Sequence, residues 1–366
     1  MFRLALRTSS RISTRPLLQR GICAAPPTPA AAPKRRAAPT PEKEKRAETD
    51  TRRINARLSK GKTAHTLMRL YSEFGKHFTH INLATCWTRL AKTDPNERAN
   101  FNLDRSDALS TLRDQTSRQL GTFEPRHLTD TARSVAALKL AGAAWTSLWK
   151  ELEGATLARL SFFNSQDMAS TARAFVNARQ STPALLDAIA EKAAEEIAAR
   201  GVLDFNHVQL ASMAFTYAKA GHAAPALFDA IGTEATGRVR DFNPQGLTNT
   251  AWAFATAGHP APALFDAIGT QATERVGEFM PRGLTILAYA FATAGHAAPE
   301  LFDAIGTRAA ARRDELSLYD QNTLKWAFPA VGLAIPAFLD EVVATEAAES
   351  LYGSQATGPV RLGSGE

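Results

Sequence analysis

The stretch Gly258-His-Pro-Ala-Pro-Ala-Leu-Phe-Asp-Ala-Ile-Gly269 decides the fold, because the chain repeats it on both sides at a fixed spacing. Nearly the same residues occupy 221–232 and 295–306, each 37 positions away. A second phrase, Phe242-Asn-Pro-Gln-Gly-Leu247, recurs with the same step at 205–210 and 279–284. Self-similarity with a period of roughly 20–50 residues is the signature of a repeat architecture such as a solenoid.

Less regular copies of this unit lie on both sides of the best ones. A later copy includes Trp326, Gly332, Pro336 and Asp340, with a slip near Tyr319. Earlier copies begin at Phe163, with about five extra residues before Phe205, and at Phe123. The segment Asn82-Leu-Ala-Thr-Cys-Trp87 is a weaker match, so we count five clear copies and one or two degenerate ones.

Each copy predicts two helices. In the best copy Asn243 suits an N-cap, Pro244 a first helical position and Gly258 the position that ends a helix. Pro262 then opens a second helix. Glycines recur inside the second helices at 232, 269 and 306, which indicates either a close helix crossing or an accident copied by duplication. Helix pairs of this kind cannot bury their apolar faces alone, so the sequence predicts an all-α fold, an α-solenoid over residues 63–345.

The N-terminal segment has the composition of a targeting sequence. Residues 1–41 contain no Asp or Glu, and Arg3, Arg7, Arg11 and Arg15 fall four apart among Ser, Thr and apolar residues. This pattern is typical of a transit peptide. We therefore expect residues 1–23 to direct the protein to an organelle, with the mitochondrial matrix first and the chloroplast second. A basic tail without a partner is the alternative.

The flanks of the repeats predict disorder. Residues 24–62 are rich in Ala, Pro and charge, which predicts a disordered basic linker, and the Gly/Ser-rich residues 346–366 predict a disordered tail. The chain has no apolar run of eighteen residues or more, so we expect no membrane insertion.

Charge is divided unevenly along the chain. Residues 1–62 hold 16 Lys/Arg and 4 Asp/Glu, a net charge of +12, whereas the remaining 27 Lys/Arg and 32 Asp/Glu leave the repeats at −5. The net charge of +7 therefore does not argue that the repeats bind nucleic acid.

The phrase Phe242-x-Pro244-Gln245-x-Leu247-x-Asn249-x-x-Trp252-Ala253-x-Ala255-x-x-Gly258-x-x-x-Pro262 resembles the octotricopeptide repeat and is similar to the helical repeats of FAST-kinase-like and RAP-domain proteins. The resemblance covers roughly residues 123–341 and implies an organellar RNA-binding protein. Two features depart from these families: the period is slightly shorter, and no RAP-like sequence follows the last repeat. The second departure removes any reason to expect nuclease-like chemistry.

The side of each first helix opposite its apolar stripe carries small or polar side chains that vary between copies. Repeat proteins that read single-stranded RNA use two or three such side chains per base. The candidates for RNA contact are Arg126, Asp130, Gln166, Ser170, Asn177, Ser212, Thr216, Lys219, Gln245, Asn249, Thr256, Arg282 and Thr293. Candidates for phosphate contact are Arg173, Arg179, Lys219, Arg238, Arg240, Arg275 and Arg282. The alternative for these columns is a solvated helix face.

An aromatic residue recurs on the same helices. Trp252 has counterparts in Tyr289 and Trp326, and such a ring either stacks on a base or packs between repeats. We expect packing.

Other chemistry finds little support in the sequence. His222, His259 and His296 recur at the repeat period, but successive copies of a solenoid lie roughly 10 Å apart. Three such histidines cannot share one zinc, whose ligands lie about 2 Å away. The chain has no GxSxG, HExxH or Cys/His nucleophile pattern, so we expect no enzyme activity, metal, cofactor or small-molecule substrate.

The leading hypothesis is a mitochondrial RNA-binding repeat protein acting in RNA processing, transcript stability, translation or rRNA maturation. Its expected partners are single-stranded organellar RNA and ribonucleoprotein or ribosomal proteins. The alternative is a protein-binding scaffold in an organellar ribonucleoprotein complex. RNA binding predicts cations gathered on the first helices, whereas a scaffold predicts an exposed apolar stripe there.

Overall fold

Each repeated unit folds into two helices whose ends lie at the predicted residues. Asn243 caps α12 (Pro244–Ala257), where its side chain accepts a hydrogen bond from the Gly246 N–H at 2.7 Å. Gly258 follows this helix in the left-handed conformation, with φ of 62°. Pro262 opens α13 (Pro262–Glu274) at a position where a helix requires no N–H donor. The predicted two-helix unit is confirmed.

The computed structural model describes residues 41–200 and 205–339. The predicted transit peptide, residues 24–40 of the predicted linker and everything after residue 339 lie outside these ranges. Residues 46–366 belong to one compact unit and residues 1–45 to another. No strand is present in the described ranges, and none of their helices is both long and apolar enough to cross a membrane.

The helices alternate between two layers. We call the first helix of each copy an A helix and the second a B helix. The A helices are α6 (Pro125–Leu138), α8 (Ser165–Asn177), α10 (His207–Ala220), α12, α14 (Pro281–Thr293) and α16 (Leu318–Ala330). The B helices are α7 (Ala143–Leu157), α9 (Pro183–Arg200), α11 (Pro225–Gly237), α13 and α15 (Pro299–Ala311).

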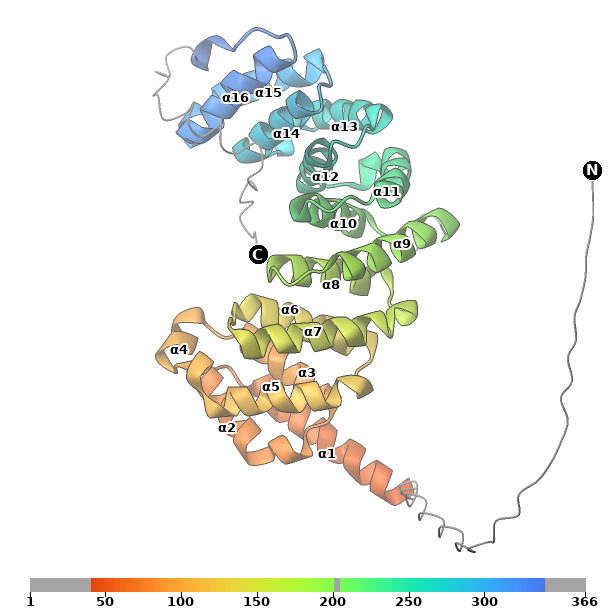
Figure 1. Cartoon of the computed structure of the whole chain (residues 1–366). Helices are drawn as coiled ribbons and strands as arrows, with labels where there is room; N and C mark the ends of the chain where they lie inside the picture. Colours follow the sequence, from red (N-terminus) through yellow and green to blue (C-terminus); the bar gives the residue numbers. More distant parts are fainter. Residues whose placement is uncertain (1–40, 201–204, 340–366) are drawn as a thin grey trace, which may run out of the picture. The chain divides into compact units, whose positions relative to one another are not determined.

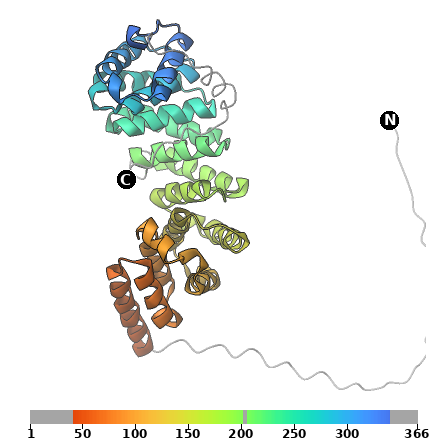
Figure 2. The same cartoon turned by 90° about the vertical axis from the view of Figure 1, so that its left-hand side faces the viewer.

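Each A helix packs against the next A helix, and each B helix against the next B helix. Figures 1 and 2 show these pairs following one another from α6 to α16. The predicted α-solenoid of stacked helix pairs is confirmed.

The same arrangement continues through the N-terminal part of the predicted solenoid, and one further helix, α1, lies before it. The helices of this part are α1 (Pro41–Lys60), α2 (Ala64–Phe74), α3 (His80–Ala91), α4 (Pro95–Asn100) and α5 (Asp107–Gln119). Helix α3, which contains the weak match at 82–87, packs against α6 as an A helix does, and α5 packs against α7.

The disordered linker predicted for 24–62 is wrong over residues 41–60, which form α1. Ile54 and Leu58 of α1 are buried, and the Asn82 side chain of α3 donates to the Thr51 carbonyl at 3.1 Å. The Pro and charge content of the whole segment predicts disorder. The few apolar residues of α1 lie at helical spacing, however, and they are enough to pack this helix against the fold.

Phenylalanines and glycines fix the spacing of the layers. A buried residue precedes every A helix, at Phe123, Phe163, Phe205, Phe242, Phe279 and Leu316. Leu316 follows Phe279 by 37 residues, so the slip inferred near Tyr319 does not exist. A Cβ added at Gly232 would lie 3.3 Å from the Phe254 ring, and one at Gly306 would lie 3.4 Å from the Phe328 ring. Gly232 therefore marks a close helix crossing, one of the two explanations that the sequence leaves open, whereas a Cβ at Gly269 or Gly306 would meet ordinary van der Waals contacts.

Candidate nucleic-acid interface

The exposed side of the A-helix layer carries the predicted contact residues. We number positions from the buried residue that precedes each A helix and define the A face as positions 3, 7, 10 and 14 after it. Position 3 is occupied by Arg126, Gln166, Val208, Gln245, Arg282 and Tyr319, which are all exposed. Position 14 is occupied by Ala137, Asn177, Lys219, Thr256, Thr293 and Ala330, which are also exposed. These two columns form the most accessible part of the layer.

Most of the candidates from the sequence lie on this face. Eight of them are exposed: Arg126, Gln166, Asn177, Lys219, Gln245, Thr256, Arg282 and Thr293. Asp130, Ser212 and Asn249, at position 7, are half-buried.

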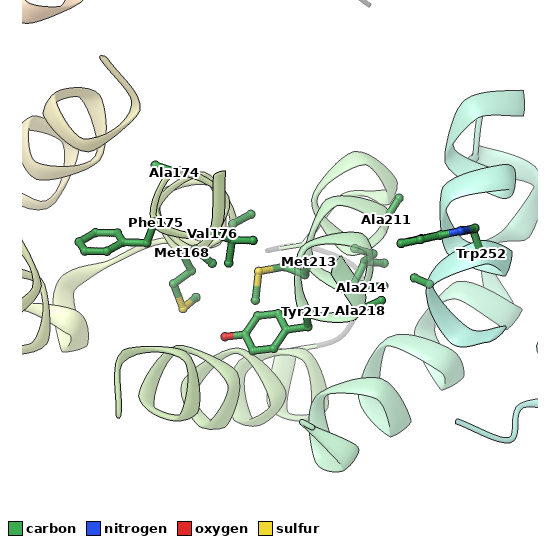
Figure 3. Close-up of a cluster of buried hydrophobic side chains, with 14 of the residues drawn as sticks. Met168, Ala174, Phe175, Val176, Ala211, Met213, Ala214, Tyr217, Ala218 and Trp252 are labelled. Carbon is green, nitrogen blue, oxygen red and sulfur yellow. The ribbon is translucent and has the colours of Figure 1, made fainter. Parts of the chain in front are cut away.

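Ser170 and Thr216 were predicted as RNA contacts, and the structure contradicts both predictions. Their relative exposures are 3% and 1%, because adjacent A helices contact one another directly. Thr216 belongs to a column that is buried in every copy from Ser134 to Ala327. Figure 3 shows how tightly this layer is filled: alanines of α10 face Trp252, and the Tyr217 hydroxyl points to α9, where it donates to the Leu186 carbonyl at 2.7 Å.

The two layers differ in charge. The six A helices α6 to α16 contain six Lys/Arg and three Asp/Glu, a net charge of +3. The five B helices α7 to α15 contain four Lys/Arg and twelve Asp/Glu, a net charge of −8. The negative charge that the sequence assigns to the repeats as a whole is thus concentrated on the B helices.

The few carboxylates of the A helices are withdrawn from the surface or paired. Asp167 and Asp320 are only 7% and 8% exposed, and burial raises the pKa of Asp167. Asp130 lies 3.8 Å from Arg126 and 3.6 Å from Arg133. The described helices α8, α10, α12, α14 and α16 therefore present no exposed Asp or Glu.

Carboxylates in the turns before the A helices are neutralised by arginines of the same turns. Arg275 donates to Glu278 at 2.8 Å and, through Nη1, to the Phe242 carbonyl of the preceding copy at 2.8 Å. Arg238 makes the equivalent bonds to Asp241 and to the Phe205 carbonyl. Arg238 and Arg275 were predicted as phosphate contacts. The structure instead assigns them to joining neighbouring copies.

Position 10 of the A face changes character along the array. Arg133 and Arg173 occupy it in α6 and α8, and Phe215, Trp252, Tyr289 and Trp326 occupy it in the later helices. Trp252 is 3% exposed, and its ring lies 4.9 Å from that of Phe215 between centroids, so the predicted packing role is confirmed for this residue. The Trp326 ring packs 5.3 Å from Tyr289 and keeps 39% exposure.

The periodic histidines also join neighbouring copies. Nε2 of His222, His259 and His296 lies 2.8 or 2.9 Å from an Asp carboxylate of the preceding B helix, at Asp187, Asp229 and Asp266 respectively. Within the described residues, no group of three His, Cys, Asp or Glu side chains is placed to hold a metal ion.

The sequence argument missed two cations of this surface, Arg133 and Lys139. Arg133 lies at position 10, the same position as the predicted phosphate contact Arg173 in the next copy. Lys139 follows α6 in the left-handed conformation, with φ of 53°. Aligning the copies on their buried phenylalanines would have found it, because glycine occupies its place in the later copies.

Comparison with models of known protein families gives a match to the repeat region. The family model described as RESC6, the RNA-editing substrate-binding complex 6 protein, matches residues 145–324, just under half of the chain, from α7 to α16. A search of curated proteins finds no match. The resemblance to octotricopeptide and FAST-kinase-like repeats stays a prediction. The repeat region of this chain is similar to an RNA-associated family of helical proteins.

Proposed function

We propose that this protein is a non-enzymatic RNA-binding repeat protein of an organelle, the mitochondrion first, whose A face holds single-stranded RNA. The observation that carries the proposal is the separation of charge between the two helix layers. RNA backbones are polyanions, and cations without facing carboxylates attract them most strongly. Arg173 and Lys219 on the A face are such cations, because no described carboxylate forms an ion pair with either of them, whereas the B helices would repel the same ligand.

Three further observations support the proposal. The matched family takes its name from a complex that binds substrates of RNA editing, which favours RNA processing as the role. Gln245 exposes an amide, which can both donate to and accept from base edges. The arginine-rich residues 1–23 support an organellar location.

Two matched triple variants of the full chain test the proposal. The first adds carboxylates at position 3 of three consecutive A helices: Gln166→Glu, Val208→Glu and Gln245→Glu. The second adds them in the first turn of three consecutive B helices: Ala184→Glu, Ala226→Glu and Ala263→Glu. All six sites are exposed, and a later B helix naturally has Glu300 at this place. Acidic residues suit the first turn of a helix, so neither set should unfold the protein.

We expect the A-helix set to weaken binding of a random-sequence single-stranded RNA by about tenfold at moderate salt, because each carboxylate opposes nearby phosphates. The B-helix set, with the same net charge, should change affinity by less than about twofold. Equal loss in both sets would mean that only total charge or the basic N-terminal segment matters, and the proposal would fail.

A protein-binding scaffold in a ribonucleoprotein complex is the second candidate. Exposed apolar side chains favour it at one end of the A layer, where Met280, Leu318 and Tyr319 are 67%, 71% and 50% exposed. A scaffold predicts that Leu318→Ser abolishes capture of a ribonucleoprotein component while RNA affinity stays unchanged. RNA binding by the A face predicts that any captured protein is lost after ribonuclease treatment.

A further inference from the structure

The position that ends each A helix differs between the early and the later copies. Gly221, Gly258, Gly295 and Gly332 occupy it in the later copies, with φ between 62° and 80°. Lys139 and Arg179 occupy it in the two earlier copies, with φ of 53° and 57°. A residue with a Cβ is strained in this left-handed region, whereas glycine is not.

Helix geometry alone does not explain these two cations. A cation is favoured at a helix C-terminus by the helix dipole. The same gain is available at the ends of α10, α12, α14 and α16, where the chain uses glycine, preceded by Ala294 after α14 and by Val331 after α16. Strained positions that persist despite a less costly residue point to function.

Three more cations stand on the same three helices. Arg133 and Arg173 lie at position 10 of α6 and α8, and Lys219 lies at position 14 of α10. Partial desolvation and then the charge of Arg133 lower the pKa of Arg173. Partial desolvation and then the charge of Arg179 lower the pKa of Lys219. The cations are therefore near enough to repel one another across neighbouring helices.

Little on the protein offsets this repulsion. Lys219 Nζ donates to Asn177 Oδ1 at 2.8 Å, a neutral partner. Arg133 lies 3.6 Å from Asp130. No described carboxylate forms an ion pair with Arg173, Arg179 or Lys219. Cations that repel one another and have few carboxylate partners are stabilised when an external anion binds to them.

We propose that Arg133, Lys139, Arg173, Arg179 and Lys219 form a binding site for consecutive phosphates of a single-stranded RNA backbone, at the C-terminal ends of α6, α8 and α10. The site rests on the proposed function and gives it a location. Its cations extend over three successive copies, which suits a chain of phosphates better than one small anion. Guanidinium groups can bind phosphate oxygens in pairs, and the ammonium groups act as point charges.

The test compares two double variants of the full chain, each lacking two cations. Arg179→Gly with Lys219→Gln changes the proposed site, and the glycine restores the residue that later copies use, so folding is preserved. Lys150→Gln with Lys76→Gln removes two exposed cations elsewhere, in α7 and in the turn after α2. Both are titrated with a random-sequence single-stranded RNA across a salt series, and thermal unfolding checks that each is folded.

The site variant should bind about tenfold more weakly, and the slope of log affinity against log salt should become less negative by about 1.4, since each phosphate contact with a single strand contributes about −0.7. The control should stay within about twofold of the wild type.

If the site variant behaves like the control while the A-helix carboxylate set still weakens binding, the site is wrong and the proposed function stands. If neither change affects binding, both are overturned.

Discussion

At the scale of single residues, the position that ends each A helix affects both the stability of the fold and the proposed binding of RNA. Arg179 holds a left-handed conformation that glycine adopts at the same place in other copies. Replacing Arg179 by glycine removes the backbone strain and also removes one cation. At this position glycine favours the stability of the fold, whereas a cation favours the binding of a polyanion.

We predict that Arg179→Gly raises the free energy of unfolding by about 0.5–1 kcal/mol, because the left-handed strain exceeds the lost attraction to the helix dipole. Urea and thermal unfolding of the full chain measure the change. The reciprocal variant Gly258→Arg should lower stability by about 1 kcal/mol. A lower midpoint for Arg179→Gly would show that the arginine stabilises the fold and would remove the strain argument.

Residue identity predicted helix ends better than it predicted contacts. Asn243, Pro244 and Gly258 end or begin helices through local rules, which need no knowledge of neighbouring copies. Ser170 and Thr216 could not be assigned in this way, because their burial depends on how closely the next A helix approaches. Because both side chains are polar, the sequence suggested that they face solvent. In the structure, close packing between alanine-rich A helices buries them.

At the scale of helices and turns, arginines and histidines link each copy to the one before. Arg275 joins Glu278 of its own turn to the Phe242 carbonyl of the previous copy. The hydrogen bond from Arg275 raises its own pKa and lowers that of Glu278, as expected for a charged pair. A planar guanidinium can make both contacts at once, which a lysine ammonium on a flexible chain does poorly.

We predict that Arg275→Lys destabilises the protein by about 1 kcal/mol through loss of the bond to the Phe242 carbonyl. Chemical denaturation measures this loss, and hydrogen exchange should show faster opening between α12 and α14 than in the wild type. Arg240→Lys, a change at an exposed cation nearby, serves as the control and should alter stability by less than about 0.5 kcal/mol. Equal effects would mean that the inter-copy bond contributes nothing specific.

These links are only partly visible in the sequence. The period of 37 residues showed that His259 has counterparts at 222 and 296, and it argued only that the three histidines cannot share one zinc. It could not show that the histidine of one copy meets the aspartate of the previous copy. That pairing depends on the rotation between copies, which no local pattern encodes.

At the scale of the whole molecule, the layer arrangement changes what the net charge means. Taken as a whole, a net charge of −5 over residues 63–366 gives no argument for nucleic-acid binding by the repeats. The distribution of charge between the two helix layers changes this conclusion, because the acidic residues gather on the B helices and leave the A face positive. The repeat period and the two helices of each clear copy were predictable from the sequence. Only the structure shows on which helix layer each charged residue lies.

The A face is itself divided along its length. Cations at position 10 in α6 and α8 give way to aromatic rings from α10 onward, and the last ring, Trp326, remains 39% exposed. Bases stack on such rings, and cations hold the backbone. The central claim is that one strand of RNA lies on this layer, neither on the B helices nor only on the basic N-terminal segment.

Ultraviolet crosslinking of the full chain to single-stranded RNA, with the crosslinked peptides identified by mass spectrometry, tests that claim most directly. We predict crosslinks in peptides of the A helices, chiefly α8 and α10 near Arg173 and Lys219, and α16 near Trp326, with few in α9, α11 or α13. Crosslinks confined to residues 1–62, or concentrated on the B helices, would contradict the account.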